Sequence, residues 1–94
     1  MNINGFIFTG IVYRDGESYS SLCPELDVAS QGDTKEEAEK ALLEAVTLYL
    51  ETAFESNLPY LRPIPSDEDP RIVNPESVLK VFNLKIDFKI KAYA

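Results

Sequence analysis

Few side chains in this sequence could support catalysis. There is no histidine, which removes the commonest general base and the commonest metal ligand. The single cysteine, Cys23, has no histidine partner and precedes Pro24, so we interpret it as a small core residue rather than a nucleophile. The sequence contains neither a zinc-ligand cluster nor a glycine-rich phosphate loop. We therefore expect no cofactor and no bound metal.

Carboxylates are plentiful, but their spacing does not gather them. A two-metal hydrolase needs several acids around ions about 4 Å apart. We expect Asp15 in a turn, Asp27 on a short strand and most glutamates on an exposed helix face. The run Asp67-Glu68-Asp69 is interpreted as a solvated loop tip, and a metal-dependent hydrolase built on it is the least favoured hypothesis. The sequence predicts a protein that is not an enzyme.

The charge distribution favours a basic protein as partner. The net charge is −7, and the first 77 residues carry fifteen acidic and five basic side chains. Such a field repels phosphate backbones, so direct nucleic-acid binding is disfavoured, while a basic protein is attracted. The alternative is that the charge serves only solubility. No apolar run approaches the roughly 20 residues of a membrane span, and the start lacks the features of a signal peptide, so we expect a cytoplasmic protein.

Three strands are expected before the helix. Residues 3–14 are rich in Ile, Phe, Val and Tyr, with apolar side chains on both faces, which predicts a strand in the middle of a sheet. Asp15-Gly16 is typical of a tight hairpin turn. The second strand covers about residues 17–23, and Pro24 ends it. Residues 26–31 then form a short third strand, and Gly32 permits the bend out of the sheet.

Residues 34–37 form a capping box, Thr-Lys-Glu-Glu, that predicts a helix running to about Phe54. Its apolar residues fall into two neighbouring stripes. The first contains Ala38, Ala41, Leu42, Ala45, Leu48, Tyr49, Thr52 and Ala53, and is expected to pack on the sheet. The second contains Leu43, Val46, Leu50 and Phe54, and needs a cover from the following loop or from another subunit.

The remaining residues form a loop and a last strand. Residues 57–77 are proline-rich and predict a long loop. Its first part is expected to pack over the second stripe of the helix, with residues 66–70 exposed. Residues 78–94 alternate apolar and polar side chains, which predicts a long strand with one wet face. This strand, through Phe88 and Ile90, and the second stripe of the helix offer surfaces for a homodimer or a higher oligomer.

The predicted fold is therefore a single α+β domain over residues 1–94, with the order β-β-β-α-β. Four strands form a sheet and one helix covers a face of it. A last strand lying parallel beside the first, through a right-handed crossover, gives the strand order third, second, first, fourth.

With these elements placed, three segments together resemble the HicB-like family of antitoxins. They are "PEL" at residues 24–26, "SQGDTKEEA" at residues 30–38 and "EAVTLYLE" at residues 44–51. The resemblance covers about residues 8–52, and the ending "FKIKAYA" is similar to that of short family members. Where members often have Pro-Gly after "PEL", this chain has Asp27-Val28. The resemblance implies a partial RNase H-like domain without catalytic acids, in a form that lacks the family's DNA-binding domain.

The resemblance also implies a function and a partner. Members bind a HicA-type toxin, a small basic mRNA-cleaving protein, and cover its catalytic histidine; they commonly form homo-oligomers. We expect Glu25, Asp27, Asp33 and Glu36, near the strand–helix turn, to steer such a toxin. The alternative is a homo-oligomeric HicB-like scaffold that has no toxin partner and binds a small ligand or another protein.

Overall fold

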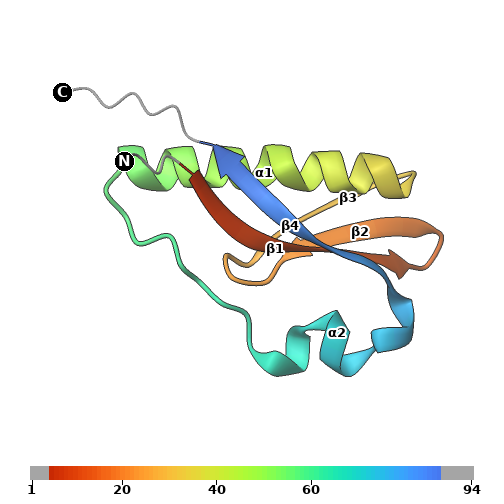
Figure 1. Ribbon diagram of the computed structural model, residues 1–94. Coiled ribbons are helices and arrows are strands. Elements are labelled where there is room, and N and C mark those ends of the chain that lie inside the picture. The colour runs from red at the N-terminus through yellow and green to blue at the C-terminus, as the bar shows by residue number, and fades with distance from the viewer. Residues whose placement is uncertain (1–4, 88–94) are drawn as a thin grey trace.

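The computed structural model describes residues 5–87, and its elements follow the predicted order (Figure 1). Among these residues, no helix is both long and apolar enough to cross a bilayer. The elements are β1 (Gly5–Asp15), β2 (Ser18–Cys23), β3 (Val28–Gly32), α1 (Lys35–Glu55), η1 (Ser66–Glu68), α2 (Pro70–Val73), η2 (Pro75–Ser77) and β4 (Val78–Asp87).

The four strands form one sheet in the order β3-β2-β1-β4, as predicted. The fourth strand, however, is antiparallel to the first, so the expectation of a parallel pair is wrong. The reason is the path of residues 56–77. The helix ends beside the start of β1, where the rings of Phe54 and Phe6 are 6.0 Å apart, and the following segment crosses to the far end of the sheet (Figure 1). There β4 begins opposite Tyr13 and runs back along β1.

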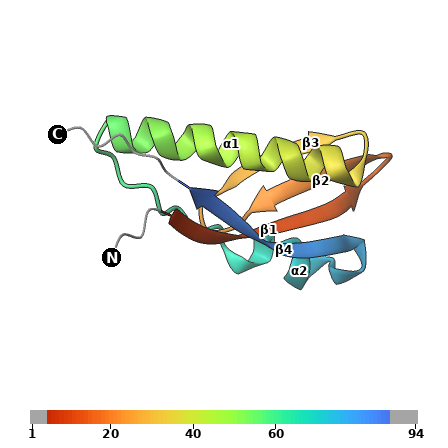
Figure 2. The same cartoon turned by 45° about the horizontal axis from the view of Figure 1, so that its top comes forward.

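The helix α1 covers one face of the sheet and closes the main core (Figure 2). Apolar side chains from all four strands, and from the turn between β2 and β3, pack against those of the helix. The sheet and turn supply Phe8, Cys23, Leu26, Val28, Leu84 and Ile86, and the helix supplies Leu42, Val46 and Leu50. Cys23 is fully buried, in agreement with its interpretation as a core residue.

The buried arc of the helix differs from the predicted stripe. Val46 and Leu50, which we assigned to an exposed second stripe, are 0% exposed, whereas Leu48 of the first stripe is 64% exposed. The buried arc consists of Ala38, Leu42, Val46, Leu50 and Ala53. It runs between the two predicted stripes, because the helix is rotated about its axis relative to our expectation.

Both ends of α1 are fixed by local hydrogen bonds. The Glu37 amide donates to the Thr34 hydroxyl, as the capping box predicts, but the Glu37 carboxylate accepts from the amide of Asp33 rather than from that of Thr34. Gly32 permits the close approach of strand and helix: a Cβ there would lie 2.6 Å from the Ala38 nitrogen. At the other end, Asn57 has a φ of 56° and the Leu58 amide donates to the Ala53 carbonyl, which is a Schellman motif.

The second face of the sheet is partly covered by residues 66–77. Figures 1 and 2 show α2 on the side of the sheet opposite α1. Ile11 and Leu22, which pair across β1 and β2, are buried on this face, as the apolar pattern of β1 predicted. Residues 66–70 are not uniformly exposed, contrary to our expectation, because Asp69 and Pro70 are buried. The first part of the loop covers the second helix stripe in part, as predicted: the Tyr60 ring packs on the Phe54 ring, with 5.2 Å between their centres. Leu58 and Leu61 of the same loop stay exposed.

Asp69 fixes the turn at the start of α2 within this covering segment. Its carboxylate accepts hydrogen bonds from the Arg71 guanidinium, with a shortest distance of 2.7 Å, and from the Arg71 amide at 2.9 Å. Hydrogen bonding to the Arg71 side chain lowers the pKa of Asp69 below its ordinary value. The ion pair therefore holds the turn before α2 in place as long as Asp69 is ionised.

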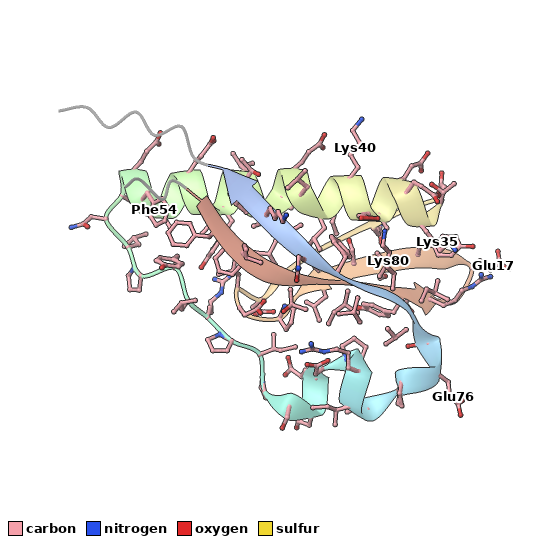
Figure 3. All side chains as sticks on the ribbon, viewed as in Figure 1. Glu17, Lys35, Lys40, Phe54, Glu76 and Lys80 are labelled. Carbon is pink, nitrogen blue, oxygen red and sulfur yellow. The ribbon has the colours of Figure 1, made fainter. Side chains whose placement is uncertain are left out.

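In addition to its backbone pairing with β1, the edge strand β4 packs an aromatic ring on a glycine of β1. A Cβ on Gly10 would lie 2.3 Å from the tip of the Phe82 ring, so only glycine leaves room for the ring. The Lys80 ammonium lies over the same ring, 5.5 Å from its centre, and bonds the Glu39 carboxylate at 3.0 Å. Figure 3 labels Lys80 among the side chains of the molecule. Phe82, Lys80 and Glu39 thus link β1, β4 and the N-terminal half of α1.

We predict that Gly10→Ala destabilises the fold by about 1–3 kcal/mol, because the added methyl group forces the Phe82 ring out of its place. Urea unfolding followed by circular dichroism measures the change. In a Phe82→Leu background, the smaller side chain makes room for the methyl group. Gly10→Ala should therefore lower the free energy of unfolding less in that background than in the wild type. Strictly additive losses would contradict the packing described.

We also predict an acid-sensitive contribution from Asp69. Since the pKa of Asp69 is lowered in the folded state, its contribution to the free energy of unfolding is full above the ordinary carboxyl pKa and is lost as the pH falls through the lowered one. Asp69→Asn should therefore lower the melting temperature at pH 6 more than at pH 3. Asp67→Asn, at a neighbouring exposed carboxylate, is the control and should change little. An equal loss for Asp69→Asn at both pH values would argue against the ion pair.

Candidate interaction surface

The described part of the chain offers little for catalysis. The thiol of Cys23 is buried, and this burial, together with the nearby Glu25 carboxylate, raises its pKa to about 12. It therefore stays protonated at neutral pH and is a poor nucleophile. Among residues 5–87, no group of three or more acidic, cysteine or histidine side chains is arranged to hold a metal ion. Asp69, part of the acidic run considered as a metal site, already binds Arg71.

Glu25, predicted as a partner contact, is used within the fold instead. Its carboxylate accepts from the Thr9 amide at 3.0 Å and from the Thr9 hydroxyl at 2.6 Å. Its backbone carbonyl accepts from the Arg62 amide at 2.9 Å. Glu25 thus joins β1, the turn between β2 and β3, and the proline-rich segment. The carboxylate satisfies the amide of Thr9, which lies on β1 just before its paired stretch with β2 begins at Ile11.

The proline-rich segment is tied to the same turn by further contacts. The Arg62 guanidinium donates to the carbonyls of Leu26 and Asp27, at 3.3 and 3.4 Å, and lies over the Tyr49 ring, 4.9 Å from its centre. The Tyr49 hydroxyl donates to the Tyr60 carbonyl at 2.8 Å. This segment therefore runs as an ordered strap from the end of α1 past the turn between β2 and β3.

The other predicted partner contacts fall into two places. Asp27 is exposed in the turn before β3, with a φ of 55°. Asp33 and Glu36 are exposed at the start of α1, at the other end of β3. A strand of this length separates the two places by roughly 15 Å. The structure brings Asp33 and Glu36 together but does not join Asp27 to them.

The outer side of α1 carries an acidic ridge that we did not predict as a site. Four exposed glutamates recur at steps of seven and four residues, which places them on one side of the helix. Leu48, 64% exposed, lies four residues after Glu44 and three before Glu51. The ridge consists of Glu37, Glu44, Leu48, Glu51 and Glu55. The spacing was readable in the sequence, but Leu48 had been assigned to the core.

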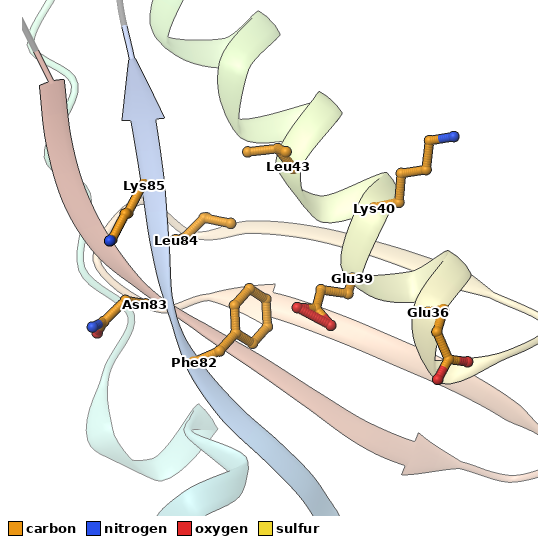
Figure 4. A pocket seen from close by; sticks show the side chains of 8 residues that line it. All are labelled: Glu36, Glu39, Lys40, Leu43, Phe82, Asn83, Leu84 and Lys85. Atoms are coloured by element: carbon orange, nitrogen blue, oxygen red, sulfur yellow. The ribbon is translucent and has the colours of Figure 1, made fainter.

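A shallow hollow of about 340 Å³ lies between the N-terminal half of α1 and β4 (Figure 4). Apolar groups of Leu43, Phe82 and Leu84 line it, with the charged side chains of Glu36, Glu39, Lys40 and Lys85 and the amide of Asn83 around them. It arises because α1 lies mainly over β2 and β3 and leaves β4 less covered.

Of the residues predicted for an oligomer interface, Leu43 and Phe54 are exposed at 41% and 37%. Val46 and Leu50 are in the core and cannot contact another subunit in the folded protein. Phe88 and Ile90 lie outside the residues that the structure describes. The prediction of an oligomer interface on the second helix stripe is therefore wrong for two of its four residues.

We predict that Glu25→Gln lowers the free energy of unfolding by about 1–3 kcal/mol, because a neutral amide replaces the charged acceptor of two hydrogen bonds. Thr9→Val, which removes the hydroxyl donor alone, should cost less. The double variant should lose less than the sum of the two single losses, since the residues act on each other. Chemical denaturation measures all three, and additive losses would show that the contact contributes nothing.

Comparisons with known proteins give the fold a name. No protein-family model matches the sequence, and no curated protein matches it. Among solved structures, the N-terminal domain of the antitoxin HicB from Burkholderia pseudomallei is similar at a TM-score of 0.62 and 24% identity, covering 88% of this chain and all of that domain. A chain of the HicA3–HicB3 toxin–antitoxin complex is similar at a TM-score of 0.52 and 19% identity, covering 76% of this chain and 83% of its own length. This chain therefore has the fold of the HicB N-terminal domain.

Proposed function

We propose that this protein is a non-catalytic antitoxin that binds a small, basic ribonuclease toxin of the HicA type and covers its active site. The observation that carries the proposal is the likeness to the HicB N-terminal domain over the whole of that domain. The similarity to a chain from a HicA3–HicB3 complex supports the same kind of partner. Both similarities are similarities of fold, and a toxin as the partner of this chain is what we propose.

The charge of the chain supports a basic partner. Beyond the net charge of −7, the exposed acids gather on α1, along the ridge from Glu37 to Glu55 and at its start with Asp33 and Glu36. Charged rims of this kind raise the rate of association with an oppositely charged protein. Leu48, surrounded by Glu44 and Glu51, supplies the apolar contact that holds the complex once it forms.

The mechanism requires only a surface. Occlusion of a ribonuclease needs neither a proton donor nor a metal from the antitoxin, which agrees with a sequence without histidine and with a buried, protonated Cys23. What it needs is a rigid platform. The shared core holds α1 on the sheet, and the Glu25 contacts join β1, the turn between β2 and β3 and the proline-rich segment, so we expect little ordering on binding.

We predict that the charge-reversing pair Glu44→Lys/Glu51→Lys weakens toxin binding at least about tenfold at low salt, mainly through slower association. The binding partner in the test is a catalytically inactive HicA-type protein, and surface plasmon resonance gives both rate constants. Asp67→Lys/Glu68→Lys makes the same change of charge on exposed residues of η1 and should leave binding nearly unchanged.

The outcomes separate the candidate functions. The antitoxin function is supported if the protein rescues cells that express the toxin and if only the charge-reversed pair on α1 weakens toxin binding. Equal losses for both charge-reversed pairs would mean that overall charge, and not the ridge, matters. No complex on co-expression would contradict the proposal and leave the alternative, a homo-oligomeric scaffold that binds another ligand or protein.

A further inference from the structure

The strand β4 leaves one edge of the sheet open. It pairs only with β1 among the described strands, and its ten residues contrast with the five of β3 at the other edge. The far side of its backbone offers a row of hydrogen-bond donors and acceptors. An extended segment of another protein can bind such an edge by adding a strand to the sheet, and the side chains beside the edge then select its sequence.

On the side of α1, an apolar space lies next to this edge. Figure 4 shows Phe82 and Leu84 pointing toward the helix, where they line the hollow together with Leu43, which is 41% exposed. Side chains of a strand alternate between its two faces, so every second residue of an added strand would point toward this hollow. Apolar side chains at those positions would be buried against Leu43 and Phe82.

On the opposite face of the sheet, β4 presents a positive charge without a partner. Figure 4 shows Asn83 and Lys85 pointing away from α1, and both are exposed. None of the described carboxylates forms an ion pair with Lys85, whereas Lys80 already bonds Glu39 at 3.0 Å. The residue of β1 opposite Lys85 is the apolar Ile7. A carboxylate on an added strand would therefore give Lys85 the cross-strand partner that β1 does not supply.

From these features we infer that β4 binds an extended acidic peptide segment of another protein by strand addition. The segment alternates apolar residues, which enter the hollow, with glutamates or aspartates, one of which pairs with Lys85. Backbone hydrogen bonds along β4 supply the affinity, and the alternation supplies the specificity. A basic segment would set a like charge opposite Lys85, which is destabilising.

The positive charge of this edge is local. Residues 78–94 contain four lysines and one aspartate, whereas residues 1–77 carry fifteen acidic and five basic side chains. The acidic body therefore repels an acidic peptide at long range. At 0.15 M salt such repulsion is screened beyond about 8 Å, so the contact with Lys85 decides the preference of the edge under physiological conditions.

This surface is separate from the acidic ridge of the proposed function, and the inference does not rest on that function. Leu43 borders the hollow beside β4, whereas Leu48 lies in the ridge on the outer side of α1. Both leucines are exposed on the same helix, so the same substitution at each tests one surface at a time. Leu43→Asp should weaken peptide binding and leave toxin binding nearly unchanged, and Leu48→Asp should do the reverse.

The test measures fluorescence anisotropy of a labelled synthetic peptide, EVELEVE, mixed with the full chain at physiological salt. The peptide should bind with a dissociation constant of at most about 100 µM. The peptide EEVLVEE has the same composition and charge without the alternation and should bind at least about fivefold more weakly. EVELEVE with every second amide N-methylated, prepared in both registers, should lose binding in the register whose amides face β4, because those donors are removed.

Two pairs of variants place the peptide on the protein. Leu43→Asp and Lys85→Glu should each raise the dissociation constant about fivefold, since the first puts a charge in the hollow and the second sets like charges opposite each other. Leu48→Asp and Lys35→Glu make the same changes at exposed positions elsewhere on α1 and should leave peptide binding unchanged. Circular dichroism confirms that all four variants are folded.

Three outcomes would overturn the inference. The first is no binding of EVELEVE at protein concentrations up to about 300 µM, including the case in which a second copy of the chain covers the edge. The second is equal binding of EVELEVE, EEVLVEE and both methylated peptides, which would exclude strand addition. The third is an equal loss for Leu43→Asp and Leu48→Asp, which would place the peptide elsewhere.

Discussion

The close docking of α1 on β2 and β3 decides the layout of the molecule. Gly32 ends β3 without a side chain, so the helix begins within contact of the strand, where a Cβ would meet the Ala38 backbone. From this point the helix runs over the side of the sheet formed by β2 and β3. The core residues of α1, among them Leu42 and Leu50, follow from that placement. So does the partial exposure of β4, since one helix cannot cover four strands evenly.

The layout divides the surface by charge. The outer side of α1 collects glutamates, while β4 carries Lys80 and Lys85. Between them, Glu39 and Lys80 form the bridge that joins the two regions. As an exposed pair it contributes little stability, but it marks the boundary of an acidic surface and a basic, apolar edge. The two surfaces therefore differ in charge and in apolar character.

Much of the fold could be read from the sequence, and the failures have physical causes. The hairpin and the helix start at Thr34 rest on local signals, which the structure confirms. The strand order is also confirmed, although it was derived with the fourth strand parallel to the first. The direction of β4 depends on which end of the sheet the proline-rich segment reaches, and no local pattern encodes this. The rotation of α1 about its axis could not be predicted, because the two apolar stripes lie side by side and either could face the sheet.

The candidate surface was harder to predict than the fold. Glu25 stands beside a proline in an acidic turn and resembles a surface charge, yet it accepts two bonds from Thr9, sixteen residues earlier. Such a contact is visible only in three dimensions. Leu48 shows the opposite error: it fits an apolar stripe by spacing, but it lies among glutamates on the exposed side of α1.

The position of β4 in the chain has a consequence for biosynthesis. Leu84 and Ile86 belong to the core, and their partners in β1 are made long before them. On the ribosome, the hairpin and α1 emerge first and leave Phe8 without its partner Leu84 until β4 clears the exit tunnel. The nascent chain therefore leaves this apolar part of the core uncovered while α1 and residues 56–77 are made, and the core closes only when β4 pairs with β1.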